Sequence, residues 1–150
     1  MRLGAERIAA SLKAAGINDA DVTVQPLGVV CRVRGPRVVA VLGALKAADY
    51  GALVDLFGTD VGSRIEITYH LRCLEDRREV YVRTRVGYDA VAKSVAEVFP
   101  AATYAEREVA ELFGLTFAGN PDMRRLLTTS EVPDPLLRKS VPLGRAAGPQ

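Results

Sequence analysis

The chain opens with hydrophobic residues at helical spacing and then changes to short runs of alternating polarity. Over residues 4–15 the apolar positions fall three or four apart, which predicts a helix that ends at Gly16. Two short strands are expected next, one at 22–24 and one at 29–33, with a break at Pro26 between them. The pattern therefore predicts a helix followed by two tightly joined strands.

A second helix is expected after Gly35-Pro36. Four apolar residues share one helical face, namely Val38, Val41, Leu42 and Leu45. Pro36 is tolerated in a first turn because the N–H that proline lacks would have no partner there. The pair Val38-Val39 also fits a strand, which stays open as the alternative for this segment.

In the middle of the chain the apolar residues alternate with polar ones, as they do in half-buried strands. Residues 52–57 predict a strand that closes at Gly58. Residues 65–73 and 80–86 predict an antiparallel hairpin around the charged turn 74–78.

The expected register of this hairpin sets Arg72 opposite Tyr81 and His70 opposite Arg83. His70 then lies on the polar face among arginines. In that setting we expect a surface histidine rather than a metal ligand or a catalytic base.

Two more helices are predicted after the hairpin. Residues 89–99 place valines on one helical face, and Pro100 follows them as a stop signal. The sequence Thr103-Tyr104-Ala105-Glu106 has the form of a capping box, in which the hydroxyl and the carboxylate each accept a hydrogen bond from a backbone N–H of the first turn. The helix that it starts is expected to end at Gly114.

Beyond Leu115 glycine and proline are frequent, and we expect regular structure to stop. The sequence thus predicts an α+β domain over residues 1–117 and an irregular C-terminal tail over 118–150, which serves for docking or is poorly ordered in isolation. The expected order is helix, two strands, helix, three strands and two helices. That order favours two layers, with helices on one face of a mainly antiparallel sheet.

Composition narrows the function classes. The chain has 150 residues, of which 49% are hydrophobic, which suits one globular domain. Its net charge of only +2 does not favour binding to nucleic acid through phosphates. Its longest apolar run, residues 38–45, is far shorter than the roughly 20 residues of a membrane-spanning helix. With no secretory signal visible, we expect a cytoplasmic chain that does not cross a membrane.

The sequence offers little catalytic chemistry. Cys31 and Cys73 are far apart and the chain has one His, so we expect buried thiols rather than a metal site or a disulfide. Signatures of phosphate loops, dinucleotide sites and nucleophile elbows do not occur. Glu106, Glu108 and Glu111 could act as acid–base or metal-binding carboxylates, but we favour a capping residue and surface or ion-paired acids. Arg107 is expected to pair with Glu111 or with another element.

Residues 106–127 carry the most specific motif in the chain. They begin with Glu-Arg-Glu, continue through Phe113-Gly114, and reach Gly119-Asn120-Pro121-Asp122-Met123-Arg124-Arg125. This order resembles the signature of the 30 kDa subunit of respiratory complex I, the proton-pumping NADH:quinone oxidoreductase. The family of this subunit, also designated type C, includes related subunits of energy-converting hydrogenases.

Shorter matches extend the resemblance over residues 36–143. They are Asp55-Leu56 with Asp60, Tyr69-His70-Leu71 and Phe99-Pro100-Ala101-Ala102. The chain departs from the family pattern at a few positions. Ala110 replaces the usual aromatic residue, Glu111 the usual Asp, Asn120 the usual His, and Ser140 an acid.

The resemblance implies an accessory scaffold subunit that carries no cofactor and performs no redox step. It implies docking onto the subunits of types B and D, which hold the terminal iron–sulfur cluster and the quinone cavity, at the cytoplasmic face of the membrane. The residues expected to contact these partners are Asn120, Pro121, Asp122, Arg124, Arg125, Arg138 and Lys139. The residues expected to build the motif's framework are Glu106, Arg107, Glu108, Phe113, Gly114 and Gly119.

Two alternatives stay open. Arg124 or Arg125 could pair with Glu106 or Glu108 inside the domain and pin the tail instead of docking. The whole chain could also be a stand-alone small enzyme or ligand-binding domain that uses His70 and the three glutamates at 106, 108 and 111.

Overall fold

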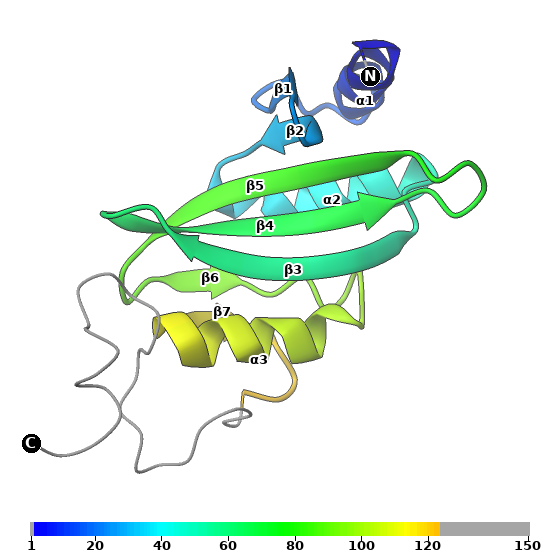
Figure 1. Cartoon of the computed structure of the whole chain (residues 1–150). Helices are drawn as coiled ribbons and strands as arrows, with labels where there is room; N and C mark the ends of the chain where they lie inside the picture. Colours follow the sequence, from blue (N-terminus) through cyan, green and yellow to red (C-terminus); the bar gives the residue numbers. More distant parts are fainter. Residues whose placement is uncertain (1, 124–150) are drawn as a thin grey trace, which may run out of the picture.

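The computed structural model describes residues 2–123 (Figure 1). The three helices and seven strands of this part, with one short 3-10 turn, follow in the order α1 (Arg2–Ala14), β1 (Asp21–Gln25), β2 (Gly28–Arg32), η1 (Gly35–Arg37), α2 (Val38–Ala47), β3 (Ala52–Asp60), β4 (Arg64–Arg72), β5 (Glu79–Gly87), β6 (Val91–Lys93), α3 (Ala102–Phe113) and β7 (Thr116–Ala118). Regular structure does not stop at Leu115, because β7 runs to Ala118, and the part of the expected 118–150 tail from position 124 onwards lies outside the described residues.

Five strands form one sheet in the order β1-β2-β5-β4-β3. Strands β3, β4 and β5 make an antiparallel meander, and β1 pairs with β2 as a second antiparallel hairpin. The two units join where β2 pairs with β5 in parallel through three residue pairs, Val30–Tyr81 to Arg32–Arg83. A small second sheet pairs β6 with β7. The predicted α+β class with a mainly antiparallel sheet is confirmed.

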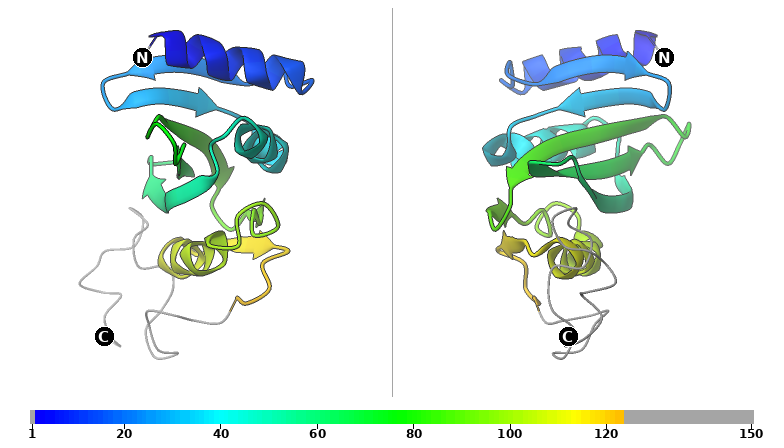
Figure 2. Two further views of the ribbon diagram at one scale, coloured as in Figure 1. Left: turned by 90° about the vertical axis from the view of Figure 1, so that its right-hand side faces the viewer. Right: turned by 60° about the vertical axis from the view of Figure 1, so that its left-hand side comes forward.

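The helices pack on one face of the large sheet, as predicted (Figures 1 and 2). The alternating residues Ile65, Ile67, Tyr69 and Leu71 of β4 are buried on that face. At the β3 edge Gly58 lies opposite Ile67, and an added Cβ there would sit only 2.9 Å from Cε2 of Phe113 in α3. A glycine at this position therefore lets α3 approach the sheet closely.

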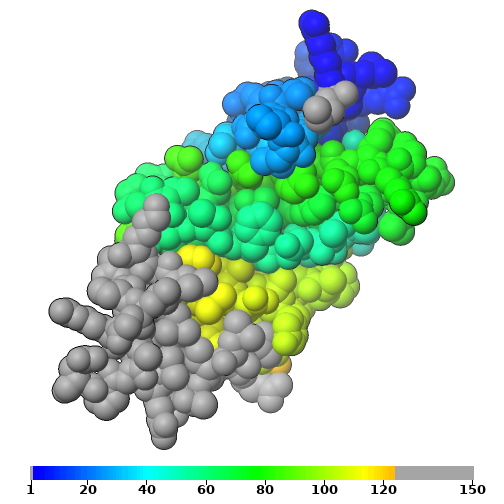
Figure 3. Space-filling model, in the orientation of Figure 1, coloured from blue at the N-terminus to red at the C-terminus, as the bar shows by residue number. Residues whose placement is uncertain are grey.

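Seen from outside, the described part is elongated (Figure 3). Helix α1 and the β1–β2 hairpin occupy one end, the β3–β5 meander the middle, and α3 the other end. In the part of the chain that the structure describes, no helix is both long and apolar enough to pass through a bilayer.

The helix predicted for residues 89–99 is wrong. The segment contains the short strand β6 and turns instead. Val91 is 68% exposed while Ala92 is buried, so the local period is two rather than that of a helix. Two backbone donors in the middle of the segment bond outside it, because Ser94 N donates to the Ala118 carbonyl and Val95 N donates to Glu106, and only the last turn keeps a local bond from Phe99 N to the Val95 carbonyl. These long-range partners replace the hydrogen bonds that a helix would make.

The hairpin register is also shifted by two residues. Arg72 pairs with Glu79 and His70 with Tyr81. The turn is tighter than expected because Cys73 N donates to the Arg78 carbonyl and Arg77 adopts a φ of 61°. In addition, β3 does not close at Gly58 but runs on to Asp60.

Three other predictions are confirmed. Helix α1 ends before Gly16, whose φ is 80°, and α3 ends before Gly114, whose φ is 71°. Residues 38–47 form a helix rather than the alternative strand. Both cysteines are free and buried.

Candidate functional site

Glu106 is the centre of the motif in α3. Its residue surface is 0% exposed, which is rare for a carboxylate. One oxygen accepts hydrogen bonds from Oγ of Ser94 at 2.6 Å and from Nδ2 of Asn120 at 2.9 Å, and the other accepts from N of Val95 at 2.9 Å. We call these four residues the Glu106 clamp. The clamp joins the segment after β6, helix α3 and the turn after β7 into one unit.

The capping box predicted for α3 is wrong. The helix begins after Ala101, and that N-cap receives no side-chain hydrogen bond. Glu106 instead points away from the first turn and takes its three donors from other segments and side chains. Burial among fixed donors offers this carboxylate more partners than the single backbone N–H of a capping box.

Asn120 holds the turn that follows β7 against α3. Its Nδ2 also donates to the Thr103 carbonyl at 3.0 Å, and its Oδ1 accepts from N of Asp122 at 2.8 Å. Gly119 supports the turn with a φ of 93°. Nη1 of Arg107 lies 3.4 Å from Oδ2 of Asp122, so of the two expected roles of Arg107 the structure shows pairing with another element. The turn directly before Arg124 and Arg125 is thus fixed by side chains of one helix.

Burial decides the electrostatics of the clamp. It raises the pKa of Glu106, and the hydrogen bonds from Ser94, Val95 and Asn120 only partly oppose this rise. Tyr69 lies fully buried nearby, and burial together with the charge of Glu106 raises the pKa of its phenol. Because Glu106 has no exposed surface, it can meet a substrate only if the clamp opens. The arrangement suits a structural anchor better than an acid–base catalyst.

The other residues of the motif have separate places. Glu108 is exposed and Glu111 is buried on α3. Phe113 packs under Gly58 near the end of the helix, and Gly114 follows it as the left-handed C-cap. Pro121 is exposed, and Asn120 and Asp122 are half-buried. The remaining expected partner contacts, Arg124, Arg125, Arg138 and Lys139, lie outside the described residues.

The structure does not assemble the alternative Glu/His site. His70 lies on the sheet face opposite the helices, where its ring stacks on Tyr81 at 4.3 Å and its Nε2 lies 3.3 Å from Oε2 of Glu79. Glu106 and Glu111 are on α3 on the other side of the sheet. Among residues 2–123 no three His, Cys, Asp or Glu side chains are grouped as metal ligands.

One charged cluster was missed by the sequence analysis. On the sheet face away from the helices, Glu66 lies 3.1 Å from both Nη1 of Arg32 and Nε of Arg85, and 3.8 Å from Nε of Arg83. Arg83, Arg85 and Glu66 could have been placed together from the alternation of the hairpin. Arg32 could not, because it arrives through the parallel β2–β5 pairing between distant segments.

With the fold described, comparison with solved structures defines its class. The chain matches a subunit in the structure of the membrane-bound sulfane sulfur reductase, an archaeal respiratory membrane complex, with a TM-score of 0.75 and 27% identity over 89% of this chain and 79% of that one. It also matches a trypsin-resistant fragment of Nqo5, with a TM-score of 0.67 and 28% identity over 81% of this chain and 99% of the fragment. The fold is thus an α+β subunit fold found in a respiratory membrane complex.

The chain belongs to the family of the 30 kDa subunit of respiratory-chain NADH dehydrogenase, which matches residues 31–147. Its relatives include the type C subunit of the NADH-quinone oxidoreductase of Rhodobacter capsulatus, which is 36% identical over 81% of this chain and 59% of the relative. The same subunit of Methylorubrum extorquens is 34% identical over 95% of this chain and 67% of the relative. The chain therefore spans about three fifths of the length of the first of these relatives.

Proposed function

We propose that this chain is an accessory scaffold subunit in the peripheral arm of a membrane-associated NADH:quinone oxidoreductase of the complex I type. It docks onto the cluster-bearing and quinone-site subunits, types B and D, at the cytoplasmic face of the membrane. Its own residues supply binding surfaces rather than a redox centre.

The observation that carries this proposal is the family match, which includes both the Glu106 clamp and the sequence that follows it. The clamp supports the proposal physically. It fixes the turn at Gly119–Asp122 against α3. A pre-ordered turn lowers the entropy that is lost when a partner binds.

Co-purification from membranes tests the proposal. The full chain, tagged at its N-terminus and expressed in its source organism, should recover subunits of types B and D in stoichiometric amounts. Recovery of the tagged chain alone from solubilised membranes would refute the scaffold role.

The same proposal predicts that the purified chain carries no stoichiometric metal, flavin or nicotinamide. Elemental analysis and an absorbance spectrum of the isolated chain measure this directly. One bound cofactor per chain would instead favour the stand-alone enzyme or ligand-binding domain.

A further inference from the structure

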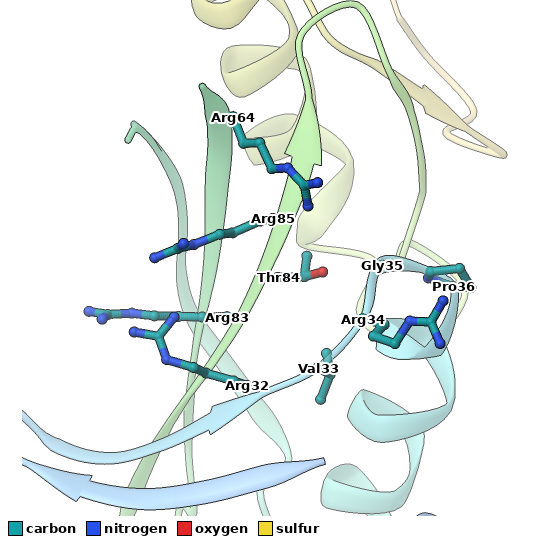
Figure 4. Close-up of a pocket in the computed structure, with 9 residues that line it drawn as sticks. All are labelled: Arg32, Val33, Arg34, Gly35, Pro36, Arg64, Arg83, Thr84 and Arg85. Carbon is teal, nitrogen blue, oxygen red and sulfur yellow. The ribbon is translucent and has the colours of Figure 1, made fainter. Parts of the chain in front are cut away.

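In the described part of the chain, the last residues of β5 have a neighbouring strand on only one side. Strand β2 pairs with β5 as far as Arg32 and Arg83, and the chain then turns away through η1 into α2, while β5 continues to Gly87. Two hollows lie along this edge of β5 on the side of α2, an outer one of about 540 Å³ (Figure 4) and an inner one of about 330 Å³, which we call the hydroxyl pocket. The two adjoin, because they share four lining residues, Gly35, Pro36, Thr84 and Arg85.

Two buried hydroxyl groups belong to residues that line the hydroxyl pocket. Tyr69 is 0% exposed and Thr84 is 3% exposed, and neither hydroxyl has a hydrogen-bond partner within residues 2–123. Figure 4 shows the Thr84 hydroxyl pointing towards Gly35, where the two hollows meet. Because a buried hydroxyl without a partner lowers stability, the two groups mark the pocket as a site for a molecule that supplies a hydrogen-bonding atom.

The rest of the pocket wall is mostly apolar. A cavity of about 150 Å³ holds one benzene molecule, so a pocket of about 330 Å³ admits a ring with substituents. Apolar walls with a few placed polar groups are the usual composition of a small-molecule site. The apolar wall residues are Pro36, Val38, Val86, Ala90, Val91 and Ala92.

Gly35 leaves room between the two hollows. A Cβ added there would lie 3.8 Å from Oγ1 of Thr84 and 3.9 Å from Cγ1 of Val86, which are ordinary contact distances. The φ of Gly35 is not positive, so the backbone itself does not require glycine at this position. A larger side chain at position 35 would therefore fill the space beside the Thr84 hydroxyl.

Positive charge surrounds the entrance. Arg34 and Arg64 line the outer hollow and Lys93 lines the hydroxyl pocket, and all three are exposed and make no ion pair within residues 2–123. In Figure 4 the guanidinium of Arg64 lies on the same side of β5 as the Thr84 hydroxyl, whereas the arginines that pair with Glu66 extend to the other side. The planar fork of a guanidinium matches the two oxygens of one carboxylate.

The charges at the two ends orient a bound molecule. Burial and the charge of Glu106 raise the pKa of the Tyr69 phenol, so this hydroxyl stays protonated and can donate a hydrogen bond. The same charge of Glu106 disfavours an anion beside Tyr69. An anionic group is therefore favoured at the outer end, near Arg34 and Arg64, and an uncharged oxygen at the inner end.

From these observations we propose that the hydroxyl pocket binds a small organic acid. Its carboxylate pairs with Arg64 and Arg34 in the outer hollow, and its apolar body fills the pocket. An uncharged oxygen at its far end bonds to the hydroxyls of Thr84 and Tyr69. The site lies within one chain, so this ligand-binding role does not depend on the scaffold role proposed above.

A rigid acid of this shape, 4-(hydroxymethyl)benzoate, is the first probe. Titrated into the full chain and followed by calorimetry and ligand-observed NMR, it should bind with a Kd of about 0.1–1 mM, as suits a molecule of its size. Two analogues test its two ends. Binding should be about fivefold weaker for 4-ethylbenzoate, which lacks the hydroxyl, and at least about tenfold weaker for 4-methylbenzyl alcohol, which lacks the carboxylate.

Variants of the chain test the matching protein groups. Tyr69→Phe and Thr84→Val remove hydroxyls that have no partner within residues 2–123, so both should melt near the wild type. Each should weaken the first probe about fivefold and leave the binding of 4-ethylbenzoate unchanged. The double variant Arg34→Gln/Arg64→Gln should weaken both acids at least about tenfold and leave 4-methylbenzyl alcohol unchanged. The control Arg7→Gln, at an exposed position of α1, should change none of these affinities.

Filling the entrance tests the location of the site. Gly35→Leu should abolish binding of all three molecules, whereas the control Gly43→Leu adds the same side chain where a Cβ meets no atom within 4 Å and should leave binding unchanged. The Tyr69 and Thr84 variants test the site independently of how Gly35→Leu folds.

Three results would overturn the inference. The first is no saturable binding of 4-(hydroxymethyl)benzoate to the folded wild type, which would leave water as the partner of the two hydroxyls. The second is binding that is unchanged in Tyr69→Phe and Thr84→Val or in a folded Gly35→Leu. The third is equal affinity for 4-methylbenzyl alcohol, which would remove the acid from the proposal. None of these results bears on co-purification with respiratory subunits, so the proposed function stands or fails separately.

Discussion

Asn120 should be the most sensitive polar residue of the clamp that can be removed without changing a charge. Replacing it with Ala removes the donors to Glu106 and to the Thr103 carbonyl and the acceptor of the Asp122 N–H. Ser94 and Val95 already donate to the same carboxylate, so neither can take the place of the amide.

The expected loss follows from the kind of each bond. The bond to the carboxylate is worth about 1.5–3 kcal/mol, and each neutral bond about 1 kcal/mol. Asn120 is half-buried, so hydrogen bonds to water replace part of the lost ones, and the free energy of unfolding should fall by about 2–3 kcal/mol. For a chain of this size, that cost lowers the melting temperature by about 4–12 °C.

Thermal and urea unfolding of the full chain at pH 8, followed by circular dichroism, measure the loss. The matched control Asn18→Ala changes an exposed asparagine before β1 and should shift the midpoint by less than about 1 °C. Asn120→His should retain most of the stability because an imidazole N–H can donate to Glu106.

A double-mutant cycle tests the specific contact. Asn120→Ala and Glu106→Gln should be non-additive, with a coupling energy of about 1–2 kcal/mol. An Asn120→Ala protein that melts within about 1 °C of the wild type, or a coupling energy of zero, would show that the clamp does not hold the turn.

Three further predictions concern packing, pH and assembly. Gly58→Ala should lower the free energy of unfolding, measured by thermal denaturation, by about 1–3 kcal/mol, because the new Cβ lies 2.9 Å from Phe113 and 3.3 Å from Val109. As a control, the new Cβ of Gly43→Ala in α2 meets no atom within 4 Å, and this variant should be more stable than the wild type. Because the pKa of Glu106 is raised in the folded state, its contribution to the free energy of unfolding is greatest below the pKa of the unfolded chain, so in urea titrations the wild type should become more stable relative to Glu106→Gln as the pH falls from 7 towards 4.5. Because the pKa of Glu66 is lowered, the extra stability of the wild type over Glu66→Gln should be lost below about pH 4.5. Arg124→Ala and Arg125→Ala should leave the melting temperature of the isolated chain unchanged, because Glu106 already accepts three hydrogen bonds and an ion pair with the exposed Glu108 is worth little. The affinity for the partner subunits should fall by about 2 kcal/mol. A lower melting temperature of the isolated chain would favour the internal pairing instead.

Local patterns predicted the elements whose hydrogen bonds are local. The first two helices, the β4–β5 hairpin and the helix before Gly114 all follow from periodicity and stop signals within one segment. Their apolar faces are periodic because each packs on one side of a single sheet.

Three of the failures share one physical cause, which is competition from distant partners. Residues 89–99 have helical spacing, but Ala118 and Glu106 accept the backbone hydrogen bonds of Ser94 and Val95. Thr103 and Glu106 match a capping box, yet the carboxylate has stronger partners elsewhere. The cluster of arginines around Glu66 could be recognised only in part, because Arg32 reaches Glu66 through a strand pairing that no local pattern reports.

The parallel β2–β5 pairing also bears on the order of folding. The β1–β2 hairpin and the β3–β5 meander each form between neighbours in sequence, whereas pairing Val30 with Tyr81 closes a loop of about fifty residues. Contacts of such long sequence separation slow folding. Arg32 reaches Glu66 only when this loop is closed, so the cluster of Arg32, Arg83 and Arg85 around Glu66 is complete only once β2 has joined the meander. The Arg32–Glu66 ion pair therefore exists only in chains in which both halves of the sheet have joined.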